Sequence, residues 1–492
     1  MGKKIEIILA ISLGFLLSLI SVSFIQRTYD LTEIDKILFF ALAIGAFSLI
    51  IKCLIDVFQR KSHIVSNLRR NTRIPDIETI KLLFFQNSPG LLVALVFIIV
   101  YLIIGSIFNA PQTAAIDNYM NADNLDWIMH IADPSGYLLI MRMPHPFALF
   151  LFRLIGWFLN FFFNDPYHTA SFLNALAGGL SVFLAWLFIK TQSGSRIHAL
   201  LVAILIGVST AHLVFGSIVE TYIFSATLLI AFFLLLLRNA SDSTLTTISL
   251  LSLGLTITNF VQTFIGFVVS RPRWKEIIHF TGIVLSLGFI FTLIHALWYP
   301  SSNPFFLISS FKGENTYTFS ILSEPFWNTY GRIILLLRTM LLYSVIAPLP
   351  YVVEGALPSF QFFRWENLHK TYLYSEYDGL GNILVYVWVG LLFFAGFSIL
   401  LRFYRNRRID LSFAFIGCLV FNFLLHCIYG DDPILYSPNW TFALIFFISI
   451  GMGNLAKSRI SQFGLLIFVL LVIYNQWQFI IFLIDTVSSN MG

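Results

Sequence analysis

The stretch PGLLVALVFIIVYLIIGSIF, residues 89–108, decides the fold class, because its twenty residues include no charged side chain. A helix of that length rises about 30 Å, which is the thickness of the hydrocarbon core of a bilayer. Similar apolar runs recur along the chain, whereas the alternating segments of a membrane β-barrel are absent. The sequence therefore predicts an all-α, polytopic transmembrane protein.

The composition supports this class over the whole chain. Its 492 residues are 58% hydrophobic and 11% charged, with a mean hydropathy of +0.83. Soluble domains carry about 25% charged residues, so this chain could not hide its apolar surface from water. The net charge of +5 does not indicate nucleic-acid binding, because the basic residues form short clusters between apolar runs. The three cysteines match no metal-ligand spacing and predict neither a disulfide framework nor a zinc site.

We predict about 11–13 spans. Eleven are assigned to residues 5–26, 34–58, 89–108, 168–190, 197–215, 218–237, 277–299, 383–403, 411–429, 439–456 and 461–486. The first run is too long for a signal-peptide core and is read as an uncleaved helix. Basic clusters at 59–73, 271–275, 402–408 and 456–459 are expected in the cytoplasm.

Two apolar runs are not simple crossings if every basic cluster shares one side. Residues 144–163 are expected to form an interfacial or partly re-entrant helix. Residues 246–270 are expected to turn back as a short helical hairpin with a break at 258–259. Large loops then occupy the opposite face at about 109–167 and 300–382, the second with a surface-lying helix at 331–350.

We divide the chain into three parts. Residues 1–80 hold two leading helices and a basic cytoplasmic loop, and residues 81–456 hold a catalytic membrane module. Residues 457–492 hold a C-terminal helix.

Acidic residues gather in the first of these loops. The segment ADNLDWIMH, residues 122–130, places Asp123 and Asp126 three residues apart and so on one face of a helix. Two nearby carboxylates push their pKa values apart, which suits one of them to act as a general base. The alternative is that these acids solvate a loop or cap a surface helix.

Other polar residues are predicted on the same face. Glu220, in SIVETYIFS, either lines a site or caps a helix, and His426 is either a phosphate contact or a core histidine. Asp431 and Tyr436 follow His426 in the segment HCIYGDDPILYSPNW. Phosphate contacts are also expected from the arginines of the loops, which are Arg142, Arg153, Arg332 and Arg338.

Signatures of soluble enzymes are missing. The chain has no G-x-x-x-x-G-K-[ST], H-E-x-x-H, G-x-S-x-G or G-x-G-x-x-G motif. A membrane enzyme without a nucleotide site needs a substrate that is already activated. A lipid-linked sugar phosphate meets this need, because its leaving group is a phosphate held at the bilayer surface.

The order of these motifs resembles the GT-C class of polytopic glycosyltransferases, and in particular bacterial relatives of dolichyl-phosphate-mannose protein mannosyltransferases. The similarity covers residues 89–456 in the segments ADNLDWIMHIA, RMPHPFALFLFRL, IVETYIFSATLLI, SLGLTITNFVQTFIGF and ILYSPNW. It implies that Asp123 is the catalytic base, with Asp126 as the fallback. The corresponding substrate-binding positions are Glu220, Asn259 (near the usual lysine of the family) and Tyr436. His145 stands where the family often has a second proline.

The expected function is transfer of a sugar from a polyprenyl-phosphate donor to a glycan, lipid or protein acceptor. The protein is expected in the plasma (inner) membrane, in contact with membrane lipids, with the chemistry on the extracytoplasmic face. No cofactor is required, and a divalent metal that screens phosphate from aspartate is an open alternative. The rival functions are a transporter or flippase of a lipid-linked glycan and a structural membrane subunit. A transporter is expected to place its polar sites near mid-bilayer.

Overall fold

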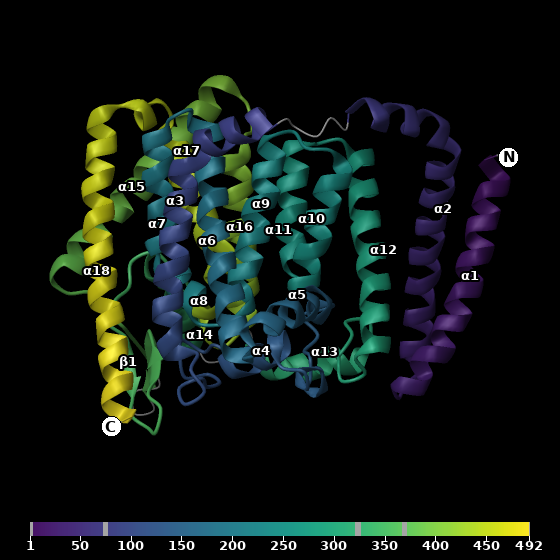
Figure 1. Cartoon of the computed structure of the whole chain (residues 1–492), viewed down its shortest axis with the longest axis horizontal. Helices are drawn as coiled ribbons and strands as arrows, with labels where there is room; N and C mark the ends of the chain where they lie inside the picture. Colours follow the sequence, from purple (N-terminus) through teal and green to yellow (C-terminus); the bar gives the residue numbers. More distant parts are fainter. Residues whose placement is uncertain (1–2, 72–76, 320–325, 367–370, 492) are drawn as a thin grey trace.

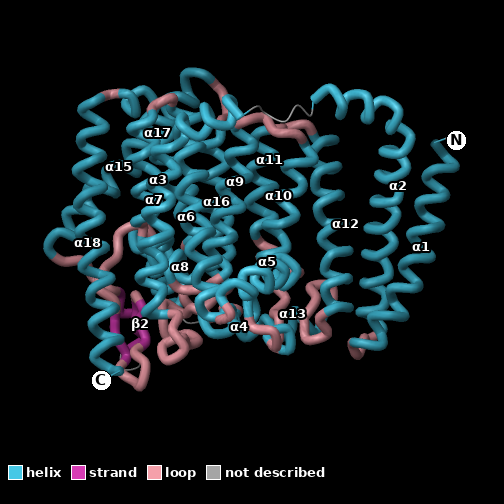
Figure 2. Tube along the Cα trace, in the orientation of Figure 1, coloured by secondary structure: helices cyan, strands magenta, loops and turns pink. Residues whose placement is uncertain are grey.

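Long helices run side by side across the molecule (Figures 1 and 2), and the computed structural model describes residues 3–71, 77–319, 326–366 and 371–491. Within these ranges nine helices are long and apolar enough to cross a membrane. They lie in α1 (Lys3–Thr28), α2 (Glu33–Asn71), α3 (Ile77–Phe108), α6 (Pro166–Ser193), α12 (Trp274–Trp298), α15 (Gly379–Asn406), α16 (Leu411–Ile428), α17 (Pro438–Met452) and α18 (Arg459–Met491). The predicted all-α, multi-pass membrane fold is confirmed.

The predicted span at 197–215 is broken. α7 (Arg196–Val208) and α8 (Thr210–Ser217) meet at an angle of 59° at Ser209 and together make a tenth candidate crossing. α9 (Thr221–Leu237), a further apolar helix, occupies the next predicted position. A continuous span was the wrong prediction here, because distant segments supply partners for the backbone groups that the bend frees.

These partners come from the region after α14 (Phe326–Arg338) and from α18. The amides of Thr210 and Ala211 donate to the carbonyls of Val345 and Ser344, at 3.4 and 3.0 Å. The Gln476 side chain donates to the Val208 carbonyl at 3.0 Å. The bend therefore leaves these polar groups bonded to protein and away from lipid.

The predicted helical hairpin is present as α10 (Asp242–Leu255) and α11 (Asn259–Ser270), with its break at residues 256–258. The segment 144–147 docks onto this break. The Ile257 amide donates to the Pro144 carbonyl (2.9 Å), and the Phe147 amide donates to the Gly254 carbonyl (3.2 Å). A Cβ at residue 254 would lie 2.0 Å from the Phe147 ring, so glycine permits this close approach.

The connections divide between two ends of the bundle. The α11–α12, α15–α16 and α17–α18 connections, which carry basic clusters, lie at the top of Figure 1. The opposite end, called the loop end below, carries α4 (Asn124–Ala132), α5 (Ala148–Phe163), α13 (Ile308–Glu314) and α14. It also carries two antiparallel pairs of short strands, β1 (Tyr351–Val353) with β2 (Ser359–Gln361) and β3 (Phe363–Glu366) with β4 (Thr371–Tyr374).

The helices of the loop end differ in how they meet the bundle. α5 exposes large apolar side chains such as Trp157 and Phe161, which fits the predicted interfacial helix. The predicted surface helix at 331–350 is α14 followed by a π-helical turn, Thr339–Tyr343, and it ends there. The chain then runs inside the bundle, where the Ala347 amide donates to Gln476 of α18 (3.2 Å). A surface position along the whole of 331–350 was therefore wrong.

The leading hairpin α1–α2 packs against α12 and holds part of the loop end. The Tyr29 hydroxyl donates to the Ser302 carbonyl (2.8 Å), and the buried Asp35 carboxylate accepts from the Ile308 amide (2.8 Å). Phe306 and Leu307 bury their side chains against Phe39 and its neighbours. The N-terminal helices therefore position the segment that leads into α13.

Replacing Asp35 with alanine should free this segment, because the Ile308 amide loses its partner. Amide exchange in peptides covering 303–311 is expected to be about tenfold faster, as measured by hydrogen–deuterium exchange. Asp30→Ala, at an exposed neighbouring position, is the matched control and should leave exchange unchanged. Equal exchange in Asp35→Ala and wild type would show that apolar packing and the bonds at residues 302 and 303 hold the segment without Asp35.

Candidate functional site

A cavity of about 250 Å³ lies at the loop end, where α9, the α10–α11 break, α16 and α17 meet. Its lining comes from stretches far apart in sequence, and Thr256, Ile257 and Thr258 of the hairpin break form part of it. The lining includes six residues selected from the sequence, namely Asp123, Arg142, His145, Glu220, His426 and Tyr436. This space is called the loop-end cavity below.

Two buried asparagines fix the turn that leads into Glu220. Asn174 of α6 donates to the carbonyls of Phe215, Gly216 and Ile218 at 2.9–3.1 Å and accepts from the Glu220 amide at 3.3 Å. Asn109, just after α3, donates to the Ser217 carbonyl at 2.8 Å and accepts from the Val219 amide at 3.2 Å. The extended backbone between α8 and α9 thus has its polar groups satisfied without water.

The Glu220 carboxyl group joins α9 to the acidic loop. Its Oε1 accepts from the amide and the hydroxyl of Thr221, at 2.7 and 2.9 Å, at the start of α9. Its Oε2 accepts from the Asp123 amide at 3.1 Å. Glu220 therefore caps a helix, which was one of the two alternatives considered from the sequence, and it also lines the loop-end cavity.

Asp123 occupies the N-cap position of α4 without capping it. Its carboxylate makes no cap hydrogen bond and no other hydrogen bond to a described residue. The carboxylate belongs instead to the cavity lining. The alternative that Asp123 serves as a side-chain cap is therefore wrong.

Burial separates the pKa values of these two acids. Burial, and then the nearby Asp117, raises the pKa of Asp123 to about 6, while Arg142 opposes this shift. Burial, and then Asp123, raises the pKa of Glu220 to about 8. Both carboxyl groups therefore hold a proton to a higher pH than a free acid does, Glu220 more strongly, which limits the repulsion between them.

The chain that leads into Asp123 has an uncommon backbone. Asp117, Met120 and Asn121 all have positive φ angles, between 56° and 63°. The Met120 amide donates to the Phe360 carbonyl (3.1 Å), and the Phe360 amide donates to the Asn118 carbonyl (2.7 Å). The β1–β2 hairpin therefore helps to hold a strained loop beside the cavity, as is common near functional sites.

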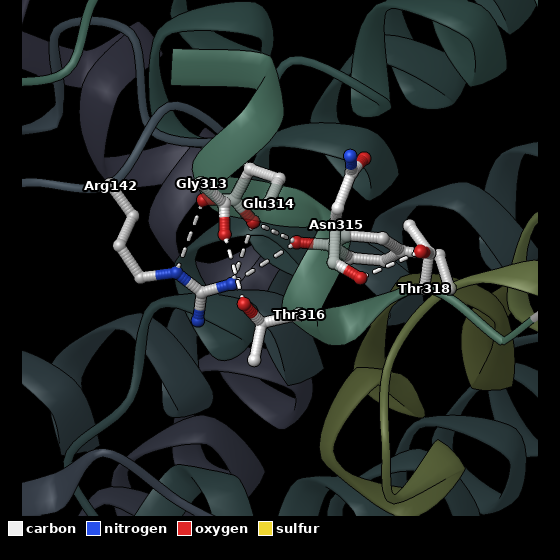
Figure 3. Close-up of polar contacts among 7 residues, drawn as sticks. Arg142, Gly313, Glu314, Asn315, Thr316 and Thr318 are labelled. Carbon is white, nitrogen blue, oxygen red and sulfur yellow. Dashed lines mark hydrogen bonds and ion pairs between the residues drawn. The ribbon is translucent and has the colours of Figure 1, made fainter. Parts of the chain in front are cut away.

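Arg142 is the one basic side chain other than histidine in the cavity lining. Its Nε and Nη2 donate to the two carboxylate oxygens of Glu314, at 3.3 and 2.8 Å (Figure 3). Nη2 also lies 3.2 Å from the Tyr429 hydroxyl, which itself donates to Glu314 (2.8 Å). The guanidinium carbon lies 3.7 Å from the centre of the Tyr317 ring. Two segments, 302–319 and the one that carries Tyr429, therefore position this cation.

The two cavity histidines are oriented by backbone carbonyls. His145 Nδ1 donates to the Leu255 carbonyl (2.6 Å), and burial lowers the pKa of His145 to about 3. His426 Nδ1 donates to the Tyr429 carbonyl (3.1 Å), and its ring stacks on Tyr436 at 4.3 Å. A neutral imidazole that donates through Nδ1 keeps Nε2 as an acceptor. His145 therefore contributes polarity and shape to the cavity, and no positive charge.

Four residues selected from the sequence lie outside the cavity lining. Asp126 is half-buried in the first turn of α4, and Arg153 donates to the carbonyls of Asp133 and Pro134. Asn259 is buried at the start of α11, and Asp431 is exposed.

Two further loop arginines have other structural contacts. The buried Arg332 donates to several carbonyls between His426 and Asp431 and so closes the end of α16. Arg338 donates to the Tyr343 hydroxyl at 3.2 Å. The carbonyl contacts of Arg332 take up the donors that were predicted to hold phosphate.

Sequence reasoning missed several residues in and beside the loop-end cavity. Glu314 and Tyr429 carry the contacts to Arg142, and Tyr222 and Asn439 line the cavity. No motif surrounds Glu314 in FKGENTY, so only the folded chain places it against Arg142. Within the described ranges, no group of three or more acidic, histidine or cysteine residues is arranged to hold a metal ion.

The fold and the site together define a multi-pass α-helical membrane protein with an acidic cavity at one end of its bundle. No model of a known protein family matches the chain, and no curated protein matches it either. The function has to be inferred from the chemistry of the cavity.

Proposed function

We propose that this protein is a glycosyltransferase that moves a sugar from a polyprenyl-phosphate donor to an acceptor at the loop end. We place this end on the extracytoplasmic face of the plasma membrane, because the basic clusters gather at the other end. One observation carries the proposal: the unpaired Asp123 carboxylate shares a cavity with the Arg142 guanidinium. The resemblance of the loop motifs to GT-C enzymes points to the same chemistry.

In the proposed reaction Asp123 acts on the acceptor and Arg142 acts on the phosphate that leaves. Asp123 accepts the proton of the acceptor hydroxyl or amine as that group attacks the anomeric carbon of the sugar. The bond from this carbon to the phosphate oxygen breaks, and the bonding electrons leave with the lipid phosphate. Arg142 stabilises the phosphate as its charge grows. Attack from the side opposite the phosphate inverts the anomeric configuration.

An apolar groove offers room for the lipid chain. It has a volume of about 690 Å³ between α14, α15, α16 and α17, and Arg338 is the one charged residue of its lining. α16 and α17 also border the loop-end cavity, through His426 and Asn439. Because two helices border both spaces, we assign this groove to the polyprenyl chain of the donor.

A transporter of lipid-linked glycans is the second candidate, and the broken helices favour it. At the α7–α8 bend, however, the freed amides of Thr210 and Ala211 are bonded to protein. The α10–α11 break faces the loop-end cavity together with Asp123. This concentration of acids beside one break supports an enzyme more than a path through the bilayer.

Purified protein in nanodiscs can distinguish the two functions. Polyprenyl-phosphate donors with isotope-labelled hexoses or pentoses would be incubated with lipid, glycan and peptide acceptors, and products followed by mass spectrometry. The proposal predicts a labelled product and free polyprenyl phosphate. Movement of the intact donor across proteoliposomes, with no transfer to any acceptor, would instead establish the transporter.

The transfer rate should depend on pH through Asp123. The base works only when deprotonated, so kcat/KM should fall below a pKa of about 6, by roughly tenfold per pH unit, and level off above it. The measurement is a pH–rate profile of the wild type between pH 4.5 and 7.5. The control is Asp126→Asn, which should show the same fall in kcat/KM at low pH. A flat profile over this range would exclude a base with this pKa.

A further inference from the structure

The segment 302–319, called the strap below, crosses the loop end and carries α13. The Asn303 amide donates to the Met141 carbonyl (2.8 Å), next to Arg142. At its other end the Gly430 amide donates to the Tyr317 carbonyl (2.8 Å) and the Phe319 amide to the Ile428 carbonyl (2.8 Å), on either side of Tyr429. Backbone bonds therefore hold the strap at both ends, independently of the Glu314 side chain.

Arg142 lies between two cavities. It lines the loop-end cavity with Asp123, and it also lines a more polar cavity of about 230 Å³ with Glu314 and other strap residues. Phe311, three residues before Glu314, lines the loop-end cavity. The strap therefore contributes to both spaces, and Arg142 is the cation they share.

The contact between Arg142 and Glu314 has the geometry that an arginine uses to bind a phosphate. A guanidinium binds a carboxylate and a phosphate in the same bidentate way, through two parallel N–H donors. Glu314 occupies Nε and Nη2, whereas Nη1 makes no hydrogen bond to a described residue and carries no dashed line in Figure 3. Glu314 is largely buried, and the Tyr429 hydroxyl also donates to it. An incoming anion would therefore find the Nε and Nη2 donors of Arg142 already bonded to Glu314.

We propose that Arg142 is the anion-binding residue of the loop-end cavity and that Glu314 is an internal carboxylate which the phosphate of the ligand displaces. This inference rests on the proposed function for the identity of the ligand, a phosphate that carries a polyprenyl chain. Displacement leaves Arg142 paired with the phosphate while Tyr317 and Tyr429 keep it in place. The Glu314 side chain then acts as the gate, since the cavity binds an anion only when this carboxylate leaves the guanidinium, while the backbone bonds keep the strap in place.

Binding measured without sugar transfer tests this inference separately from the proposed reaction. The probes are undecaprenyl phosphate, undecaprenol and inorganic phosphate, titrated into the full chain in detergent with tryptophan fluorescence as the readout. Glu314→Gln should bind undecaprenyl phosphate about tenfold more tightly, because less competition for Arg142 raises the competent fraction. Arg142→Gln should bind it at least about tenfold more weakly, because the bidentate cation is lost.

The other probes and variants complete the design. Undecaprenol should bind equally to wild type and both variants, whereas inorganic phosphate should follow the same order as the lipid phosphate, more weakly. Glu354→Gln, at an exposed position of the same loop, is the charge-matched control and should bind like wild type. Glu314→Ala, which also removes the carboxylate, should tighten binding by a similar factor and serves if Glu314→Gln does not fold.

Two results would overturn the inference. If Glu314→Gln weakens binding as much as Arg142→Gln does, Glu314 positions the arginine and does not compete with the ligand. If Arg142→Gln leaves the affinity unchanged, the anion binds elsewhere. Tight phosphate binding with this order of variants, but without sugar transfer to any acceptor, would keep the inference and reject the proposed reaction.

Discussion

Replacing Asp123 with asparagine is expected to lower kcat for sugar transfer by about a thousandfold, within the range measured for loss of a general base. Asparagine keeps the shape of the side chain and cannot accept the proton of the acceptor. The carboxylate makes no structural hydrogen bond to a described residue, so the fold should survive. The measurement is single-turnover transfer of a labelled sugar by purified protein in nanodiscs.

Asp126→Asn is the matched control for this experiment. Asp126 lies one helical turn further along α4 and outside the lining of the loop-end cavity. Its variant should keep transfer within a few fold of wild type. A large loss in Asp126→Asn with full activity in Asp123→Asn would reverse the assignment of the base.

Asp123→Asn should also make the protein more stable at neutral pH. The pKa of Asp123 is raised in the folded state, from 3.8 to about 6, so the folded state binds the proton more tightly than the unfolded state. Ionisation of this carboxyl group therefore lowers the free energy of unfolding as the pH rises from about 4 to 6. Above pH 6 the free energy of unfolding stays lower by the same amount. Asp123→Asn should raise the melting temperature at pH 7.5 and change it little at pH 4. Equal shifts at both pH values would contradict the raised pKa.

Asn174→Leu is expected to cost about 3 kcal/mol of stability and most of the transfer activity. Leucine fills a similar volume but leaves three backbone carbonyls and the Glu220 amide without their partner in a buried position. An unsatisfied buried group costs roughly 1–3 kcal/mol, and some of this is recovered by relaxation. Glu220 would shift with its amide and would no longer hold the Asp123 backbone.

Thermal unfolding in detergent, followed by circular dichroism, measures the first effect, and the transfer assay measures the second. Asn382→Leu is the control, since this exposed asparagine donates a single hydrogen bond, to the Tyr377 carbonyl. Its melting temperature should stay close to that of wild type. If Asn174→Leu also melted like wild type, the turn before Glu220 would be held by Asn109 and by packing alone.

Hydropathy predicted the long helices, and hydropathy together with the placement of the basic clusters predicted the hairpin at 246–270. A bilayer demands about 20 apolar residues per helical crossing and no unpaired backbone groups, so the pattern in the chain has few solutions. The bend at Ser209 was missed, because it depends on Ser344, Val345 and Gln476, which lie far away in sequence. The end of the helix after α14 was missed for the same reason.

Some residues of the candidate site could likewise be selected from the sequence, and others could not. Asp123 and Arg142 stood out as charged residues of a loop beside the membrane, and Glu220 and His426 as polar residues within or at the edge of apolar runs. Glu314 did not stand out, because a glutamate in a polar loop is unremarked until its partner is known. Only the folded chain showed that Asp123 lines the cavity with a free carboxylate while Asp126, three residues away, does not.

By itself the sequence determined that the chain spans a membrane as helices and that its acids collect at one end, since hydrocarbon rejects charge and unpaired backbone wherever it meets the chain. The tertiary structure alone decided which acid is unpaired, which arginine shares its cavity and which carboxylate holds that arginine. Those choices depend on distances between segments as far apart as residues 123, 220 and 314. Such distances are set by the packing of the whole bundle and leave no local pattern in the sequence.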